Sequence, residues 1–215
     1  IGRFKLHPQC AFPARKVFLK KYNIRYGEDV ECLEFDQWFK SLNAKTLSVV
    51  FSTSYPNNPS SLFGHTFLKI GKSSNNVLFD YTAAYSALVR KRDWGPLYVF
   101  KGLTGGYPGY FDITPYYQKV NEYSDLESRD LYEYELNIPK ARVDFLVAHL
   151  WELYATTYFD YFFIDENCSY LLGEVLKVAM PDWNLSPIRS AFYLPSDLIR
   201  IIKKNKNSIK KVKFR

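Results

Sequence analysis

The chain has 215 residues, of which 47% are hydrophobic and 18% aromatic, enough apolar material to bury one substantial core. The formal net charge is +7, and residues 201–215 hold seven basic residues and no acid, so the rest of the chain is close to neutral. No apolar run approaches the roughly 18 residues of a membrane-spanning helix. Because no nucleic-acid-binding motif accompanies the basic residues, we exclude nucleic acid as a partner.

The first part of the chain is predicted to form a small helical cap, residues 1–45. Its helical periodicity gives an apolar stripe that must pack on something, made of Phe35, Trp38, Phe39 and Leu42. Cys10 and Cys32 bracket the segment, and a disulfide between them fits an export compartment better than the cytosol. The alternative is a pair of buried reduced cysteines. The sequence lacks two Cys or His pairs at the spacing that zinc sites use, so we expect no metal and no cofactor.

The pattern then changes to short β-rich runs. Strands are expected at residues 46–52, 66–71 and 77–82, the last two joined by a hairpin turn at 72–76. A turn-rich loop that runs from Ser54 to Ser61 precedes His65, and a glycine-rich loop with several aromatic residues is expected at 102–111. Loops of this composition often border functional sites.

The second half repeats the order of strand and helix. A strand with period-two alternation is expected at 131–136, and Pro139 opens a helix with an apolar stripe. Residues 158–164 are predicted to be extended, and Cys168 starts an apolar helix that Pro181 ends. The sequence therefore predicts an α+β domain over residues 46–200, with an antiparallel sheet packed on helices and a basic tail at 201–215.

Cys168 is the thiol that lacks a partner in this scheme, and it lies directly after Asn167 at a helix start. Backbone N–H groups at a helix N-terminus favour the thiolate and lower the pKa of a cysteine. His65, in a strand-like stretch, is the histidine best placed to be held rigidly as its base. A cysteine and a histidine that are distant in sequence but meet in the fold are the minimum for nucleophilic acyl chemistry. The alternative is a small buried side chain with no chemistry.

Several blocks of the sequence together resemble the Lnb N-terminal periplasmic domain family. The resemblance covers roughly residues 45–200 and rests on Phe63-Gly64-His65-Thr66-Phe67-Leu68, Gly105-Gly106-Tyr107-Pro108-Gly109, the segments 129–136 and 149–153, and Asp165-Glu166-Asn167-Cys168-Ser169-Tyr170. It implies a circularly permuted papain-like fold related to NlpC proteins, in which His precedes Cys. It also implies a periplasmic thiol enzyme, some members acting as lipoprotein N-acyltransferases.

The resemblance also implies roles for single residues. Cys168 and His65 match the nucleophile and the base of the family motif. Papain-like sites take the residue that orients the histidine from an adjacent strand, which points first to Asp80 and second to Tyr81. The oxyanion of the acyl intermediate would be held by the Cys168 backbone N–H, with the Asn167 side chain or a donor from the loop of Ser54 and Ser61.

Three functions stay open at this point. The first is acyl transfer or hydrolysis on a phospholipid or lipoprotein, the second a peptidoglycan amidase or endopeptidase that uses the same two residues, and the third a non-enzymatic binding module of the envelope. The basic segment 203–215 would support the first by holding the protein against anionic head groups, each basic residue contributing about 1 kcal/mol near the surface. Its alternative is a frayed, solubilising terminus.

Overall fold

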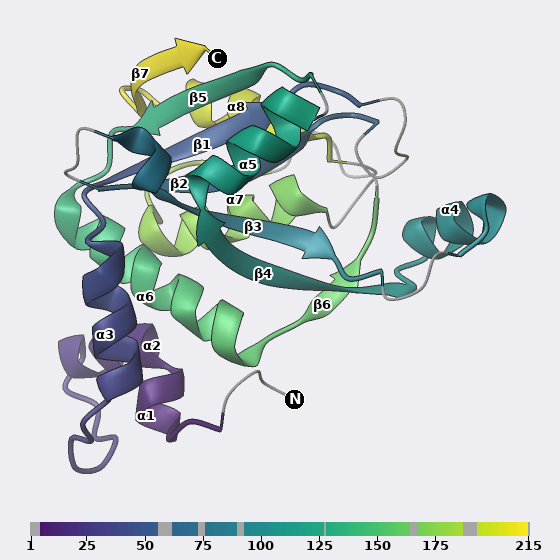
Figure 1. Cartoon of the computed structure of the whole chain (residues 1–215). Coiled ribbons are helices and arrows are strands. Elements are labelled where there is room, and N and C mark those ends of the chain that lie inside the picture. The colour runs from purple at the N-terminus through teal and green to yellow at the C-terminus, as the bar shows by residue number, and fades with distance from the viewer. Residues whose placement is uncertain are drawn as a thin grey trace.

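The computed structural model describes residues 5–55, 62–72, 76–89, 93–126, 128–163, 167–186 and 193–214, with the side chains of 124–126 excepted. These ranges hold one antiparallel sheet of seven strands in the order β6-β4-β3-β2-β1-β5-β7 (Figure 1). The strands are β1 (Thr46–Ser52), β2 (His65–Gly71), β3 (Tyr81–Ala87), β4 (Tyr107–Pro115), β5 (Leu131–Leu136), β6 (Phe159–Tyr161) and β7 (Ile209–Phe214).

Helices lie on both faces of this sheet, which confirms the predicted α+β class. They are α1 (Pro8–Ala11), α2 (Pro13–Lys21), α3 (Leu33–Leu42), α4 (Gly95–Leu103), α5 (Tyr116–Val120), α6 (Lys140–Thr156), α7 (Cys168–Ala179) and α8 (Pro195–Lys204). A 3-10 turn, η2 (Val77–Phe79), precedes β3, and a π-helical segment, η3 (Asn121–Leu126), follows α5. Each helix in the described ranges is too short or too polar to cross a membrane.

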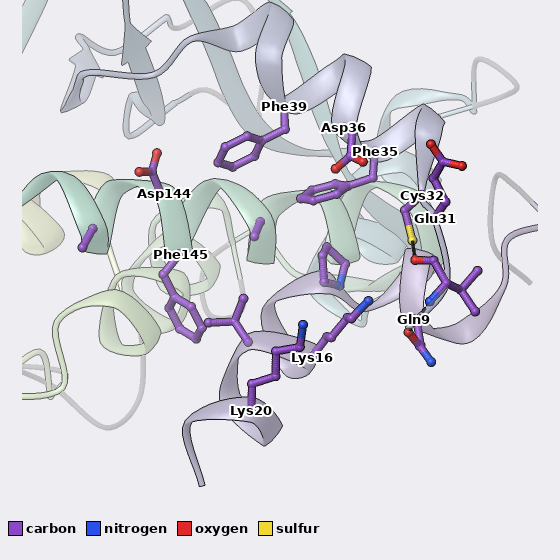
Figure 2. A pocket seen from close by; sticks show the side chains of 15 residues that line it. Gln9, Lys16, Lys20, Glu31, Cys32, Phe35, Asp36, Phe39, Asp144 and Phe145 are labelled. Carbon is purple, nitrogen blue, oxygen red and sulfur yellow. Dashed lines mark hydrogen bonds between the residues drawn. The ribbon is translucent and has the colours of Figure 1, made fainter. Parts of the chain in front are cut away.

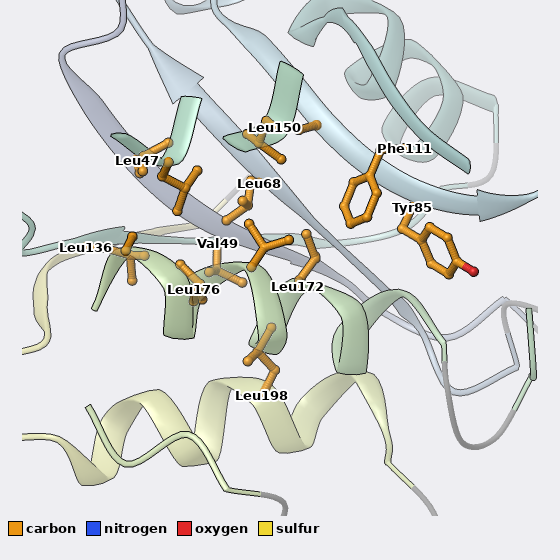
Figure 3. Close-up of a cluster of buried hydrophobic side chains, with 14 of the residues drawn as sticks. Leu47, Val49, Leu68, Tyr85, Phe111, Leu136, Leu150, Leu172, Leu176 and Leu198 are labelled. Atoms are coloured by element: carbon orange, nitrogen blue, oxygen red, sulfur yellow. The ribbon is translucent and has the colours of Figure 1, made fainter. Parts of the chain in front are cut away.

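One face of the sheet, here called the core face, packs on α6, α7 and α8. Figure 3 shows leucines of these helices meeting side chains of β1 and β2 at the centre of the main core. The strand residues on this side are Leu47, Val49, Leu68 and Ile70, all fully buried. Burial of a leucine or isoleucine side chain contributes about 1.5–3 kcal/mol, so this face supplies most of the hydrophobic stabilisation.

The opposite face of the sheet, here called the outer face, lies beneath α5 and η3. Its small apolar cluster includes Val50, Phe67, Tyr116 and Tyr123. Charged residues are buried beside that cluster: Lys69 contacts Glu133 at 2.9 Å and Asp80 at 3.3 Å. Because successive side chains of a strand point to opposite faces, Phe67 and Lys69 face outward while Leu68 and Ile70 enter the core.

The N-terminal cap is held to α6 by polar and aromatic contacts. The structure contains the predicted disulfide between Cys10 and Cys32. The Trp151 indole N–H donates to the Cys10 carbonyl at 2.8 Å, and its ring lies 5.0 Å from that of Trp38. Glu152, buried in α6, accepts the Arg15 backbone N–H at 2.9 Å, so a carboxylate satisfies a free donor at the start of α2.

The basic tail is an ordered part of the fold, which corrects the expectation of a frayed terminus. Residues 209–214 form β7, which pairs antiparallel with β5, and α8 before it buries Ile201 and Ile202 in the main core. Three of the tail lysines contact residues of β5: Lys203 lies over the Tyr134 ring at 5.0 Å, Lys210 pairs with Glu135 at 3.3 Å and Lys213 with Glu133 at 3.5 Å. The tail therefore joins the sheet.

Candidate functional site

Cys168 is the first residue of α7, as predicted, and Asn167 is its N-cap. The Asn167 side-chain oxygen accepts the backbone N–H groups of Ser169 at 3.0 Å and Tyr170 at 3.4 Å. Its amide nitrogen donates to the Tyr193 carbonyl at 2.6 Å, which ties the helix start to the segment before α8. The Asn167 side chain thus caps α7 and uses one of its two N–H donors on Tyr193, and its role as an oxyanion donor stays a prediction.

The Cys168 thiol is buried, with 2% of the residue exposed, and hydroxyl groups surround it. The Thr66 hydroxyl donates to the Cys168 sulfur at 3.7 Å and lies 2.5 Å from the Ser169 hydroxyl. Burial raises the pKa of the Cys168 thiol, although hydrogen bonds from Thr66 and Ser169 act in the opposite direction. Removing a thiolate from water costs more than these hydrogen bonds return, so the surroundings favour the thiol over the thiolate in this conformation.

Tyr161 of β6 completes the surroundings of the thiol. Burial raises the pKa of Tyr161 well above its usual value, and interactions with Cys168 contribute to that shift. Its ring stacks on Tyr85 at 5.2 Å and meets Phe163 at 6.2 Å. Cys168 therefore lies at the end of an aromatic cluster that joins β3, β6 and the chain that follows β6.

His65 does not meet Cys168 in this structure. It is the first residue of β2, and its ring lies 6.0 Å from Tyr123 on the outer face. The neighbouring residue, Thr66, is the one that reaches the thiol, because the pleat of the strand turns consecutive side chains to opposite faces. The prediction of an assembled pair of Cys168 and His65 is corrected accordingly: the sheet separates the two side chains.

The surroundings of His65 keep it uncharged. Burial, together with the nearby positive charges of Lys119 and Arg129, lowers the pKa of His65 to about 3. Arg129 is itself buried: it donates to the Thr53 carbonyl at 2.6 Å and the Ser52 hydroxyl at 2.7 Å. His65 is thus a neutral member of a rigid polar cluster.

The two residues predicted to orient His65 are engaged elsewhere. Asp80 accepts the Lys72 backbone N–H at 2.8 Å and pairs with Lys69, so it belongs to the buried ion cluster. Tyr81 pairs with Ile70, five residues along β2 from His65, a separation of about 17 Å. Neither residue can hold the imidazole in this arrangement, which corrects both assignments.

The loop before β2 is only partly described. Ser54 follows β1 and is exposed, whereas Ser61 lies outside the described residues, as do Asp165 and Glu166 before Asn167. The expected strand at 77–82 begins at Tyr81, because the Asn76 side chain accepts the Leu78 backbone N–H at 3.1 Å and caps the turn η2. The loop predicted at 102–111 is mostly the end of α4 and the start of β4.

The residues that sequence reasoning missed are Thr66, Ser169 and Tyr161. A signal for Thr66 existed: Leu68 and Ile70, at even positions of the same strand, are apolar, and Thr66 shares their face. Ser169 follows Cys168 directly, but its contact with a strand about a hundred residues earlier has no sequence signature. Among the described residues, no group of His, Cys, Asp and Glu side chains is arranged to hold a metal ion.

A separate cavity of about 480 Å³ lies between the cap and the first half of α6 (Figure 2). Phe35, Phe39 and Phe145 line it together with Lys16 and Lys20, and the disulfide-bonded Cys32 lies at its wall. Both lysines pair with Asp29 at 3.0 Å. None of the predicted catalytic residues lines this cavity, so it is distinct from the surroundings of Cys168.

A comparison with models of known protein families finds one match for this chain. The model of the Lnb N-terminal periplasmic domain matches residues 34–205, which include α3 from its second residue and every element from β1 to α8. No curated protein and no solved structure matches the chain significantly. The matched region contains Cys168, His65 and the whole sheet except β7, while most of the cap precedes it.

Proposed function

Because the chain belongs to the Lnb N-terminal periplasmic domain family, we propose that it is a thiol-dependent acyl-transfer enzyme of the periplasm with Cys168 as its nucleophile. The observation that carries the proposal is the place of Cys168: the described cysteine outside the disulfide is the first residue of α7, at the positive end of the helix dipole. Thiol enzymes use this position because the dipole stabilises both the thiolate and the oxyanion that forms next to it.

The reaction takes two steps. The Cys168 sulfur attacks the carbonyl carbon of an ester donor and a carbon–sulfur bond forms. The carbon–oxygen bond to the alcohol then breaks, and the thiol proton passes through a base to the leaving alcohol oxygen. An amine or water then attacks the thioester, the carbon–sulfur bond breaks, and the proton of the acceptor returns to the sulfur. A phospholipid is the proposed donor and a lipoprotein amine the proposed acceptor; water in place of the amine makes the reaction a hydrolysis.

His65 remains the proposed base, which requires a change at the start of β2. His65 forms the end pair of the ladder between β1 and β2, opposite Ser52, so turning it breaks only the last pair. Gly64 before it has a φ of +92°, a conformation that glycine adopts easily. Rotation of the chain at Gly64 would carry the imidazole from the outer face to the thiol beside Thr66. The described conformation is then a resting state.

The permuted papain-like fold belongs to the same proposal. Its support is the order His65 before Cys168 and the packing of α7 against β2 and β3 of an antiparallel sheet. That arrangement places a helix N-terminus next to a strand, where papain-like enzymes assemble nucleophile and base.

A non-enzymatic envelope module is the second candidate, and one observation favours it. The Cys168 thiol is buried and has a raised pKa, while His65 faces the opposite side of the sheet. A protein that keeps the fold but not the chemistry would have an inert thiol of this kind.

Intact-mass analysis after incubation with phospholipid vesicles tests the proposal. We expect the mass of one acyl chain to be added to the wild-type protein, and no addition to Cys168→Ala. His65→Gln should form the adduct at least about a hundredfold more slowly, the usual contribution of a general base. A parallel digestion of muropeptides distinguishes an amidase, which would cleave them without lipid. If neither substrate reacts and iodoacetamide at about pH 6 leaves Cys168 unmodified, the module is the better description.

A further inference from the structure

Helix α4 projects from the body of the protein (Figure 1). Several of its large apolar side chains are exposed. Trp94, its N-cap, is 69% exposed and Phe100 is 64% exposed, and Val99 and Leu103 are exposed on the same side of the helix. Val99 and Phe100 lie four and three positions before Leu103, so both are neighbours of Leu103 on one side of the helix. Large side chains in a contiguous exposed stripe mark an interaction site.

The inner side of α4 is already occupied. Tyr98 lies 5.2 Å from the Phe163 ring, and the Phe163 backbone N–H donates to the Gly102 carbonyl at 2.8 Å. A side chain at Gly102 would overlap the Phe163 ring, so the close approach depends on glycine at this position. The helix is therefore apolar on both sides. Packing against Phe163 accounts for the apolar residues on the side of Tyr98 and Gly102, but not for those on the exposed side. Soluble helices that are apolar all round are normally buried.

The length and charge of this region favour a bilayer surface as the partner. Nine residues of helix extend about 13.5 Å, too short to cross a hydrocarbon core of about 30 Å but enough to lie along its surface. Between Ser86 and Phe111 the sequence has four basic residues and one acid, and three of the basic residues, at 90–92, lie outside the described residues. The described acid, Asp93, pairs with Lys101 at 2.9 Å. In the sequence, the three basic residues directly precede Asp93 and the exposed Trp94, and a basic segment beside exposed aromatic side chains matches anionic head groups above an acyl layer.

We propose that α4 docks on an anionic bilayer and buries Trp94, Phe100 and Leu103 in the interface. The proposal does not depend on acyl chemistry, because the surface would bind lipid whether or not Cys168 reacts. It does give the thiol a connection to the membrane: Tyr98 of α4 contacts Phe163, Phe163 contacts Tyr161, and Tyr161 contacts Cys168. An element held in the bilayer would thus be packed directly against the wall of the candidate site.

Vesicle co-sedimentation tests this surface. The variant is Phe100→Asp, and the matched control is Phe79→Asp, because Phe79 is 61% exposed on η2, at another part of the surface. With vesicles that contain phosphatidylglycerol, we expect Phe100→Asp to weaken binding by at least about tenfold and Phe79→Asp by less than about twofold. Both variants should melt at the wild-type temperature, since neither side chain is buried.

A second readout follows Trp94 itself. Quenching of tryptophan fluorescence by brominated lipid should occur in the wild-type protein and should disappear in Trp94→Phe, although Trp38, Trp151 and Trp183 remain. Equal vesicle binding by Phe100→Asp and the wild type would overturn the proposal, as would equal losses in the two aspartate variants. Sedimentation velocity tests whether a second copy of the chain is the partner instead. A wild-type dimer that Phe100→Asp converts to a monomer, together with no vesicle binding, would assign the stripe to that second copy.

Discussion

The two faces of the sheet stabilise the same strands in different ways. On the core face, Leu68 and Ile70 pack against leucines of the covering helices, and the polar exception is the hydroxyl cluster of Thr66 at the thiol. On the outer face, His65 and Lys69 are buried among charged and aromatic groups. The six residues 65–70 thus alternate between the core face, which is mainly apolar, and the outer face, where charged groups lie beside a small apolar cluster. A motif that is contiguous in sequence is divided between two environments as soon as it becomes a strand.

The largest expected effect is the loss of the charge at the centre of the outer face. Lys69→Met leaves Asp80 buried without its cation and leaves Glu133 with the more distant Lys213 alone, which should lower the free energy of unfolding by about 3–5 kcal/mol. The neighbouring core-face change, Ile70→Val, should cost only about 0.5–1.5 kcal/mol. Urea denaturation at neutral pH measures both. Equal losses would mean that the ion cluster contributes no more than ordinary packing.

The next effect concerns His65 and pH. The unfolded chain binds a proton at His65 below about pH 6.5, whereas the folded chain, with a pKa of about 3, does not. The contribution of neutral His65 to the free energy of unfolding is therefore fully present above about pH 6.5. It decreases as the pH falls toward 3, by up to about 1.4 kcal/mol per pH unit. Between about pH 6.5 and 5 the loss should reach about 2 kcal/mol.

His65→Gln should remove this pH dependence, and His149→Gln, at a histidine of α6 paired with Glu152, should keep it. Denaturation curves at the two pH values provide the comparison. If the wild-type protein is equally stable at both, His65 is solvated or charged in the folded state and the outer face is more open than described.

A smaller effect is expected in the polar part of the core face. Thr66→Val and Ser169→Ala each remove one hydroxyl of a buried hydrogen bond and should cost about 1 kcal/mol, with a coupling energy of similar size in the double variant. Because both hydroxyls also contact the Cys168 thiol, iodoacetamide labelling of Cys168 should change in the same variants. Strictly additive losses would show that the two hydroxyls are independent.

The smallest effect on stability is expected from charge changes in the basic tail, part of which forms strand β7. Deleting it would remove β7 and the buried end of α8, so charge substitution is the informative change. Replacing the exposed Lys204, Lys206 and Lys211 with Gln should change stability by less than about 0.5 kcal/mol. If the tail contacts membranes, binding to phosphatidylglycerol vesicles should weaken and the salt dependence should decrease. Unchanged binding would leave α4 as the proposed membrane contact.

The bounds of the helices and strands could be predicted from the sequence better than the face of the sheet to which each side chain points. The strands 46–52 and 131–136 were predicted to the residue, because the first is a short run rich in β-forming residues and the second alternates with period two. The start of α7 followed from Asn167 and its end from Pro181. The expected strand at 77–82 began too early because the cap by Asn76 competes with extended backbone.

The candidate site was predicted only in part for the same reason. Sequence reasoning placed Cys168 at a helix start, and the disulfide of Cys10 and Cys32 left it as the free thiol. It could not show which face His65 takes, because a shift of one residue reverses the face and the register is set by pairing with β1. Nor could it show the cost of burial at the thiol, which depends on the three-dimensional surroundings of Cys168.

The strand β7 has a consequence for the behaviour of the protein in a crowded compartment. It is one of the two edge strands of the sheet, and the other, β6, has only three residues. An open edge invites strands of other molecules to add to it and so promotes aggregation. Lys210, Lys211 and Lys213 occupy half of β7. Each added strand would bring like charges together, so the lysines of the tail protect the sheet from intermolecular pairing whatever else they bind.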